Sequence, residues 1–132
     1  MSTDNKSLMQ HVFAELAKGN SRPFGEAMAE DVCWTIAGSS AWSRTWRGRK
    51  VVLSELMSPL FARFSDTYTC QAHRMIAEGD CVVVEARGSV TTKSGKPYRN
   101  HYCYVCRLVD GKLVEVTEYM DTELAIAVLG PP

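Results

Sequence analysis

The chain has 132 residues, of which 45% are hydrophobic and 23% are charged. This length and composition predict one globular domain over residues 1–132 with a buried core. Fifteen Lys and Arg residues balance fifteen Asp and Glu residues without forming a basic run, so neither nucleic acid nor an anionic membrane surface is expected as a partner. No apolar stretch approaches the roughly 18 residues of a membrane span.

The N-terminus and the cysteines indicate the compartment. The first ten residues, MSTDNKSLMQ, lack the basic start and apolar run of a signal peptide. The five cysteines are odd in number and scattered, which is more typical of a reducing cytosol than of a disulfide framework. Cys103 and Cys106 are three apart in an expected strand and point to opposite faces. We therefore expect a cytoplasmic protein with no metal site.

The first part of the chain reads mainly as helices. A helical stripe predicts a first helix that ends at Gly19-Asn20, with its apolar face at Leu8, Val12, Phe13 and Leu16. A short helix over about 23–29 and a strand over 32–37 that carries Trp34 follow. A Gly-Ser loop with Trp42 and Trp46 then ends at Gly48.

A third helix has the clearest pattern in the chain. Apolar residues recur at helical spacing, at Leu53, Leu56, Met57, Leu60, Phe61 and Phe64. Pro59 lies inside this stripe and has no N–H to donate, so we expect a kink or break near Ser58.

From Asp66 onward the pattern becomes β. Strands are expected over 67–78, 80–91, 99–109 and 112–120, joined by turns at Gly79-Asp80, Ser94-Gly95 and Asp110-Gly111. Short connections make these neighbours antiparallel. Residues 122–129 are expected to form a short helix or an arm, and Asp121 is expected to be the N-cap of the helix. Helices followed by a strand meander indicate an α+β fold, a curved antiparallel sheet backed by helices.

Alternation within the strands predicts a polar wall at one end of the sheet. Because outer strands run opposite to the strand between them, five polar side chains should share one face, namely Glu85, Arg87, Asn100, Tyr102 and Glu118. Apolar side chains would close the other end. This gradient is typical of a small-molecule pocket.

The sequence is compatible with two alternatives for this wall. A three-residue loop at Val109-Asp110-Gly111 places Tyr102 across from Glu118, whereas a two-residue turn places Cys103 there. Glu85 and Arg87 could also face water, with the core side of their strand formed by Val82, Val84 and Ala86.

Nearly the whole chain resembles a known family. The run AEGDCVVVEARGSVTTKSGKPYRNHYCYVCRLVDGKLVEVTEYMDT, together with EDVCWTIAG and WRGRK, resembles the SnoaL-like branch of the nuclear-transport-factor-2-like superfamily. The resemblance implies an α+β cone or barrel, a bent antiparallel sheet wrapped around three N-terminal helices. It also implies a pocket inside the cone and a homodimer formed through the outer face of the sheet.

Residues that perform known reactions in this family are replaced at several positions of this sequence. At the position of the ketosteroid isomerase base stands Ile36, and Val12 replaces the catalytic tyrosine of those enzymes. An aliphatic side chain cannot accept a proton. Glu85, Arg87 and Glu118 resemble the charged residues of limonene-epoxide-hydrolase-like sites. The acidic and the basic residue of the first strand, however, stand in the opposite order.

These residues define the expected function. With Glu118, Arg87 and Glu85 as catalytic groups, the wall would support acid–base chemistry without a cofactor on a mostly apolar, oxygen-bearing molecule. The residues expected to bind the substrate are Asn100, Tyr102, Trp34, Trp42, Trp46 and Met120. The alternatives are a structural ion pair that braces the sheet, a binding protein without catalysis and a protein-interaction module.

Overall fold

The first two helices lie close to their predicted positions. The computed structural model describes residues 2–132, with side chains from Asp4 onward. Helix α1 spans Ser2–Leu16 and α2 spans Arg22–Ala27. Gly19 adopts φ 91° after α1, a left-handed conformation that glycine accepts without strain and that ends the helix.

The third helix is continuous, but its hydrogen-bond pattern changes from α to π and back to α. It consists of α3 (Arg49–Val51), the π-helical segment η1 (Val52–Met57) and α4 (Ser58–Phe61). It begins and ends earlier than predicted, but the predicted irregularity lies at Ser58. Pro59 has no amide hydrogen for the regular ladder, and the π-helical turns end where α4 begins.

Six strands form one curved sheet in the order β2-β1-β6-β5-β4-β3. The strands are β1 (Met28–Ile36), β2 (Thr45–Arg47), β3 (Thr69–Glu78), β4 (Cys81–Thr91), β5 (Pro97–Val109) and β6 (Lys112–Met120). Strand β2 was expected to be loop, and β1 pairs with β6 in parallel, so the sheet is not wholly antiparallel. Because β2 and β3 remain as edges, the sheet does not close into a barrel.

The β5–β6 hairpin follows neither predicted register. Asp110 and Gly111 have φ values of 51° and 75° and form a two-residue turn between Val109 and Lys112. The register then shifts, because Leu108 pairs with Leu113 and Arg107 with Glu115, which leaves Val114 as an extra residue. Without this extra residue the two-residue turn would place Glu118 opposite Cys103. With it, Glu118 lies opposite Tyr104, on the same face of the sheet as Tyr102.

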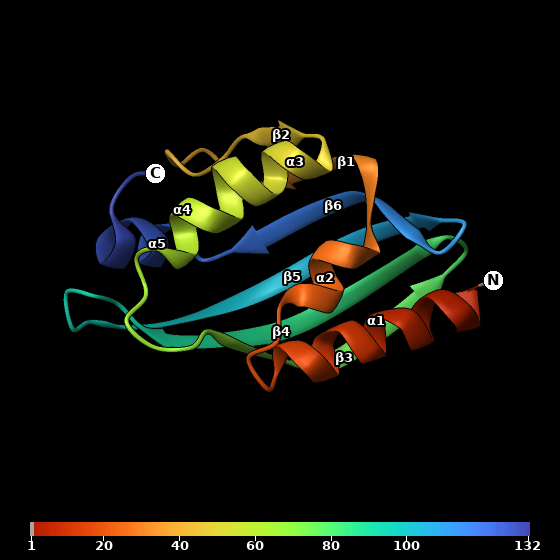
Figure 1. Cartoon of the computed structure of the whole chain (residues 1–132), viewed down its shortest axis with the longest axis horizontal. Helices are drawn as coiled ribbons and strands as arrows, with labels where there is room; N and C mark the ends of the chain where they lie inside the picture. Colours follow the sequence, from red (N-terminus) through yellow and green to blue (C-terminus); the bar gives the residue numbers. More distant parts are fainter. Residues whose placement is uncertain (1) are drawn as a thin grey trace.

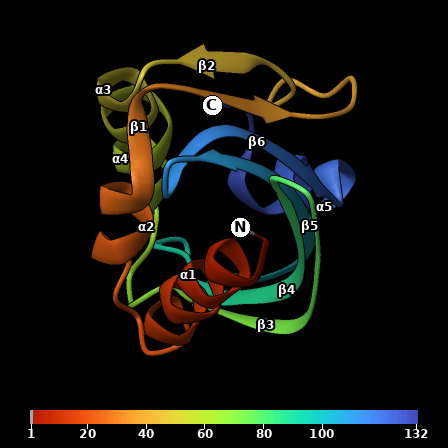
Figure 2. The same cartoon turned by 90° about the vertical axis from the view of Figure 1, so that its right-hand side faces the viewer.

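The concave face of the sheet wraps around the three helical segments and forms an open cone, as Figure 2 shows. In Figure 1, helix α1 lies along β3 and β4, while α3 to α4 lie on the β1–β2 side. Aromatic side chains from α1, α2, β1 and β5 meet in the core, with ring centroids 5.5 to 6.2 Å apart, at Phe13, Phe24, Trp34 and Tyr104.

Helix α5 (Thr122–Leu129) lies at one end of the cone. The Asp121 side chain accepts a hydrogen bond from the amide of Leu124, which confirms the predicted helix cap. No helix within residues 2–132 has both the length and the apolar character that crossing a bilayer requires.

Candidate functional site

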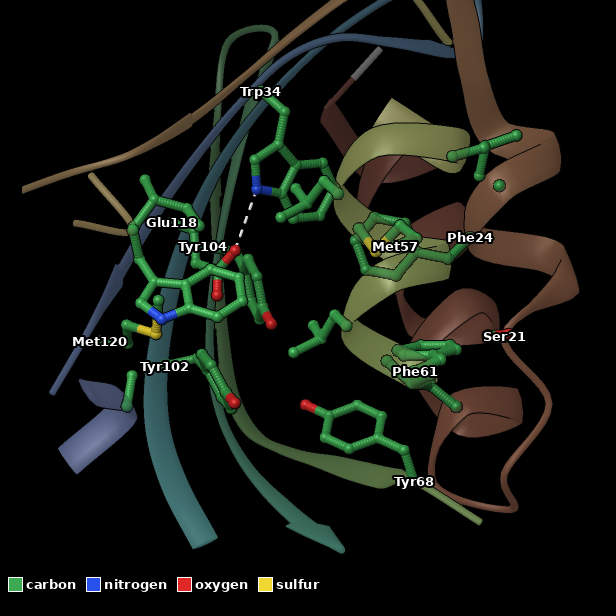
Figure 3. A pocket seen from close by; sticks show the side chains of 18 of the residues that line it. Ser21, Phe24, Trp34, Met57, Phe61, Tyr68, Tyr102, Tyr104, Glu118 and Met120 are labelled. Atoms are coloured by element: carbon green, nitrogen blue, oxygen red, sulfur yellow. Dashed lines mark hydrogen bonds between the residues drawn. The ribbon is translucent and has the colours of Figure 1, made fainter. Parts of the chain in front are cut away.

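A cavity of about 110 Å³ lies between the concave face of the sheet and the helices α2, η1 and α4. Its wall is mostly apolar, and Figure 3 shows aromatic rings from both sides pointing into it. Met57, Leu60 and Phe61 from the third helix form the helical side of this wall. The apolar stripe of that helix therefore supplies part of the cavity wall as well as the core.

Glu118 brings the one carboxyl group into this wall among the described residues. Alternation along β6 points Val116, Glu118 and Met120 inward, and Glu118 is only 8% exposed. The indole Nε1 of Trp34 donates a hydrogen bond of 2.9 Å to Glu118 Oε1. Burial raises the pKa of Glu118 to about 7, although the Trp34 hydrogen bond opposes the rise.

Tyrosines supply most of the remaining polar atoms of the cavity. Four of them line it, Tyr68 from the segment before β3 and three from β5, namely Tyr98, Tyr102 and Tyr104. Burial raises the pKa of each hydroxyl, so each is a neutral donor near neutral pH. Tyr104 is the direct cross-strand partner of Glu118, a place predicted for Tyr102 or Cys103.

Gly88 makes room for these rings. A Cβ atom at this position of β4 would lie 2.5 Å from the Tyr68 hydroxyl and 2.8 Å from Cε2 of Tyr102. Real Cβ contacts are not this short, so any larger residue would displace one or both rings. The absence of a side chain at Gly88 thus lets two tyrosines reach the sheet surface.

Asn100 is buried on the predicted face but braces the fold. Its side-chain amide donates to the Tyr98 hydroxyl at 2.8 Å and to the Asp121 carbonyl at 3.0 Å. Its oxygen accepts from the amides of Asp121 and His101. These bonds hold Tyr98 and the β6–α5 junction in place, so the Asn100 amide is engaged within the protein rather than directed at a ligand.

The structure contradicts the predicted positions of Glu85 and Arg87. The inward side of β4 carries Val82, Val84 and Ala86, as the alternative interpretation had it. Glu85 points to the outer face and pairs with Arg74 at 2.5 Å, and the hydrogen bond from Arg74 lowers the pKa of Glu85. Arg87 is exposed. Charged side chains avoid the desolvation cost of the core by facing water.

The other expected binding residues divide between the cavity and the core. Trp34, Trp42, Tyr102 and Met120 line the cavity. Trp46 is buried and pairs with Trp34 across β1 and β2, but it is not part of the cavity wall. The Trp42 indole donates to the Gly130 carbonyl at 2.7 Å and so ties the C-terminal end to the loop before β2.

Three of the lining tyrosines were not predicted as site residues. Tyr98 and Tyr104 share the parity of Asn100 and Tyr102 along β5, so alternation alone could have identified them. Tyr68 falls within the strand expected over 67–78, but β3 begins at Thr69, so the alternation of the strand does not set the direction of its side chain. The sequence indicates Tyr68 only indirectly, through Gly88, because a glycine within a strand often marks a place where another group approaches closely.

The sequence profile of the SnoaL-like domain matches residues 9–116 of the chain. This range runs from within α1 to Val116 of β6, so Glu118 and Met120 lie just beyond it. The chain belongs to the SnoaL-like domain family. No match is found among curated protein sequences.

Solved structures show the same fold as this SnoaL-like chain. A proposed SnoaL-like polyketide cyclase from Jannaschia sp. CCS1 has a TM-score of 0.80 at 18% identity, over 99% of this chain and 94% of that one. An NTF2-like protein from Burkholderia thailandensis E264 has a TM-score of 0.80 at 21% identity, over 96% and 98%. TerC, crystallised with polyporic acid, has a TM-score of 0.78 at 19% identity, over 96% and 98%.

In this SnoaL-like domain the cavity carboxyl comes from β6. Ile36, which the resemblance matches to the isomerase base, also lines the cavity and is the β1 neighbour of Glu118 in the sheet. A carboxyl that titrates near neutral pH can take or give a proton, and neutral tyrosine hydroxyls can donate to a substrate oxygen. The arrangement therefore offers one acid–base group and several donors in an apolar enclosure.

Proposed function

We propose that this SnoaL-like protein binds a small, mostly apolar, oxygen-bearing molecule and moves a proton to or from it through Glu118, without a cofactor. The single observation that carries the proposal is the buried Glu118 carboxyl, whose pKa is raised to about 7, in the wall of an apolar cavity. A general acid or base works best when its pKa lies near the working pH. Positioned proton transfer typically contributes about 10²–10⁴ in rate.

The tyrosines would stabilise the charge that develops on the ligand oxygen. Tyr102 and Tyr104 stack at 5.5 Å between ring centroids, and both lie on β5 next to Glu118 on β6. A ligand carbonyl near their hydroxyls would place an adjacent C–H bond within the part of the cavity that Glu118 reaches. Proton abstraction beside a carbonyl is therefore the reaction that this wall supports best.

Hydrogen–deuterium exchange of small cyclic ketones in D₂O tests the proposal. The wild-type protein should exchange the protons beside the carbonyl faster than buffer does, with a rate that rises as the pH increases through about 7. Glu118→Gln should lose this exchange, and the exposed Glu78→Gln variant should keep it. An exchange rate that is the same in Glu118→Gln and wild type would refute proton transfer by Glu118.

Binding without catalysis is the second candidate, favoured by the lone carboxyl, since Glu85 and Arg87 do not reach the cavity. The same experiment separates the two candidates. Ketones that shift the NMR signals of lining residues but show no exchange above buffer would indicate a binding protein. The presence of a cavity favours a ligand-binding role. A cone filled by side chains would instead favour a protein-interaction module.

We also propose a homodimer that forms through the outer face of the sheet, and a cytoplasmic location. The outer face carries a small apolar patch, where Val83 of β4 pairs with Val105 of β5 and Cys103 of β5 pairs with Tyr119 of β6. Tyr119 is 50% exposed on this face, so a second copy would remove apolar surface from water. All five cysteines are free, which accords with a reducing compartment.

A further inference from the structure

The charges around the cavity do not balance when Glu118 is ionised. No Lys, Arg or His is among the residues that line the cavity in the described chain. The hydrogen bond that the Glu118 side chain receives there comes from Trp34, whose indole is neutral. An ionised Glu118 would therefore place an uncompensated negative charge in an apolar enclosure, which is costly unless a cation joins it.

We propose that this cavity selects molecules that carry one ammonium group on a small apolar body, and that Glu118 is the residue that pairs with the ammonium. The inference rests on the ligand-binding part of the proposed function and names a ligand class for it; in such a complex Glu118 is paired with the ammonium and does not act as a base. A ligand cation would supply the positive charge that the protein itself does not place there.

Aromatic rings next to Glu118 favour the same ligand class. The rings of Phe24, Trp34 and Tyr104 lie with centroids 5.5 to 6.2 Å apart, and all three line the cavity. A cation within about 6 Å of an aromatic centroid is attracted by the ring quadrupole, and more strongly where water is excluded. Figure 3 shows Glu118, Trp34 and Tyr104 next to one another on one side of the cavity, so an ammonium paired with Glu118 would lie close to aromatic rings.

The size of the cavity limits the apolar body of the ligand. The volume of about 110 Å³ is somewhat below that of an engineered cavity of about 150 Å³ that takes benzene. One ring or a similar group therefore fills the enclosed part. Longer ligands would extend toward the half-exposed Leu53 and Met57 of the third helix.

Binding of an ammonium ligand should release a proton from the protein. A cation binds the carboxylate form, so a protonated Glu118 gives its proton to solvent as the ammonium–carboxylate pair forms. The other titratable groups near Glu118 are Cys70 on β3 and three tyrosines of β5, namely Tyr98, Tyr102 and Tyr104. Burial raises the pKa of each of these, that of Cys70 to about 11, so Glu118 is the group that titrates near neutral pH.

A matched pair of ligands tests the inference. Benzylamine and benzyl alcohol carry the same ring and differ in the ammonium group. Each is titrated into the ¹⁵N-labelled full chain, and the Trp34 indole signal, assigned with Trp34→Phe, reports binding beside Glu118. At about pH 8 the wild-type protein and Glu78→Gln should bind benzylamine about tenfold more tightly than benzyl alcohol.

Two further arms locate the preference at Glu118. Glu118→Gln should bind both ligands with about equal affinity, which also shows that its cavity is intact. In the wild-type protein, acidification from about pH 8 to about pH 6 should weaken benzylamine about tenfold and leave benzyl alcohol unchanged, because only the ionised fraction of Glu118 accepts the cation. The second arm needs no substitution.

Opposite results overturn the inference in distinguishable ways. If benzyl alcohol binds as well as benzylamine in the wild-type protein, or if the preference survives in Glu118→Gln, the ammonium subsite is refuted and the proposed ligand-binding function remains. If neither ligand moves the Trp34 signal at saturating concentration, both the subsite and the proposed binding role are refuted.

Discussion

Glu118 is a residue whose burial opposes folding once it ionises. Its pKa is raised in the folded protein from 4.5 to about 7, so the folded state holds a proton that the unfolded state has already released. Stability that is present below about pH 4.5 is therefore lost as the pH rises through about 7. A shift of this size corresponds to about 3 kcal/mol.

The first prediction follows from this linkage. Glu118→Gln removes the ionisation, so its free energy of unfolding relative to wild type should rise by up to about 3 kcal/mol between about pH 5 and about pH 8. Urea unfolding at several pH values measures the difference. Glu78→Gln, in which an exposed carboxyl is replaced, should track the wild type throughout. A constant difference between Glu118→Gln and wild type would mean that Glu118 does not titrate in this range.

A second prediction concerns Gly88, which lies beside two of the cavity tyrosines. Gly88→Ala would force Tyr68 and Tyr102 apart and should cost about 1–3 kcal/mol of folding free energy. It should also weaken ligand binding, since both rings line the cavity. Ser89→Ala, one residue along β4 and on its other face, is the control for both measurements. Equal stability of Gly88→Ala and wild type would show that the rings do not pack against this position.

Among the elements, α5 and the residues after it are held by few contacts. The Arg63 guanidinium donates to the carbonyls of Leu129 and Pro131 at 2.8 and 3.0 Å and lies 5.0 Å from the centroid of Trp42. Ala125 and Leu129 line the cavity. The Arg63 contacts thus hold Leu129 in its place in the cavity wall.

A third prediction concerns these contacts. Arg63→Ala should speed amide hydrogen exchange over residues 124–130 about tenfold, while the strand amides change little, because the lost bonds are local. Arg44→Ala is a matched control, since Arg44 also lies over a tryptophan, 5.2 Å from the centroid of Trp46, without contacts to the C-terminal residues. Equal exchange over 124–130 in Arg63→Ala and wild type would contradict this role.

The helices and strands could be predicted from sequence because their apolar periods are long and clear. The inward face of β5 was also determined, since Asn100, Tyr102 and Tyr104 alternate with more exposed neighbours. The inward face of β4 could not be predicted, because valines occur at both even and odd positions of this strand. Only the tertiary structure decides it, by placing Glu85 opposite Arg74 on the solvent side.

The register at Glu118 could not be predicted for a different reason. It depends on the bulge at Val114, and a valine gives no local signal for an extra residue. Likewise, the three residues of β2 pair with β1 although their segment has the composition of a loop. Such features are set by how the whole sheet closes over the helices, which local patterns do not record.

Assembly is a property of the whole molecule and gives a fourth prediction. If the outer face of the sheet pairs with a second copy, light scattering should show a dimer, and Tyr119→Lys should convert it to a monomer, because a charge would enter the apolar patch. Ala14→Lys adds a charge at an exposed position of α1, which lies on the concave side of the sheet, and should leave the dimer intact. A monomeric wild-type protein at high concentration would refute the proposed dimer.

The cone as a whole sets the environment of its one cavity carboxyl. The curved sheet and the three helical segments exclude water from Glu118, and the cation-free wall leaves that carboxyl without a charge partner among the described residues. The proposed proton transfer and the proposed ammonium subsite both depend on this property.

A ¹³C NMR titration of the Glu118 side-chain carboxyl, assigned with Glu118→Gln, tests this property most directly. The structure predicts a midpoint at about pH 7, accompanied by a shift of the Trp34 indole signal, since the indole is bonded to this carboxyl. A midpoint near 4.5, the ordinary value for a glutamate in water, would contradict the burial of Glu118 and the functions proposed from it.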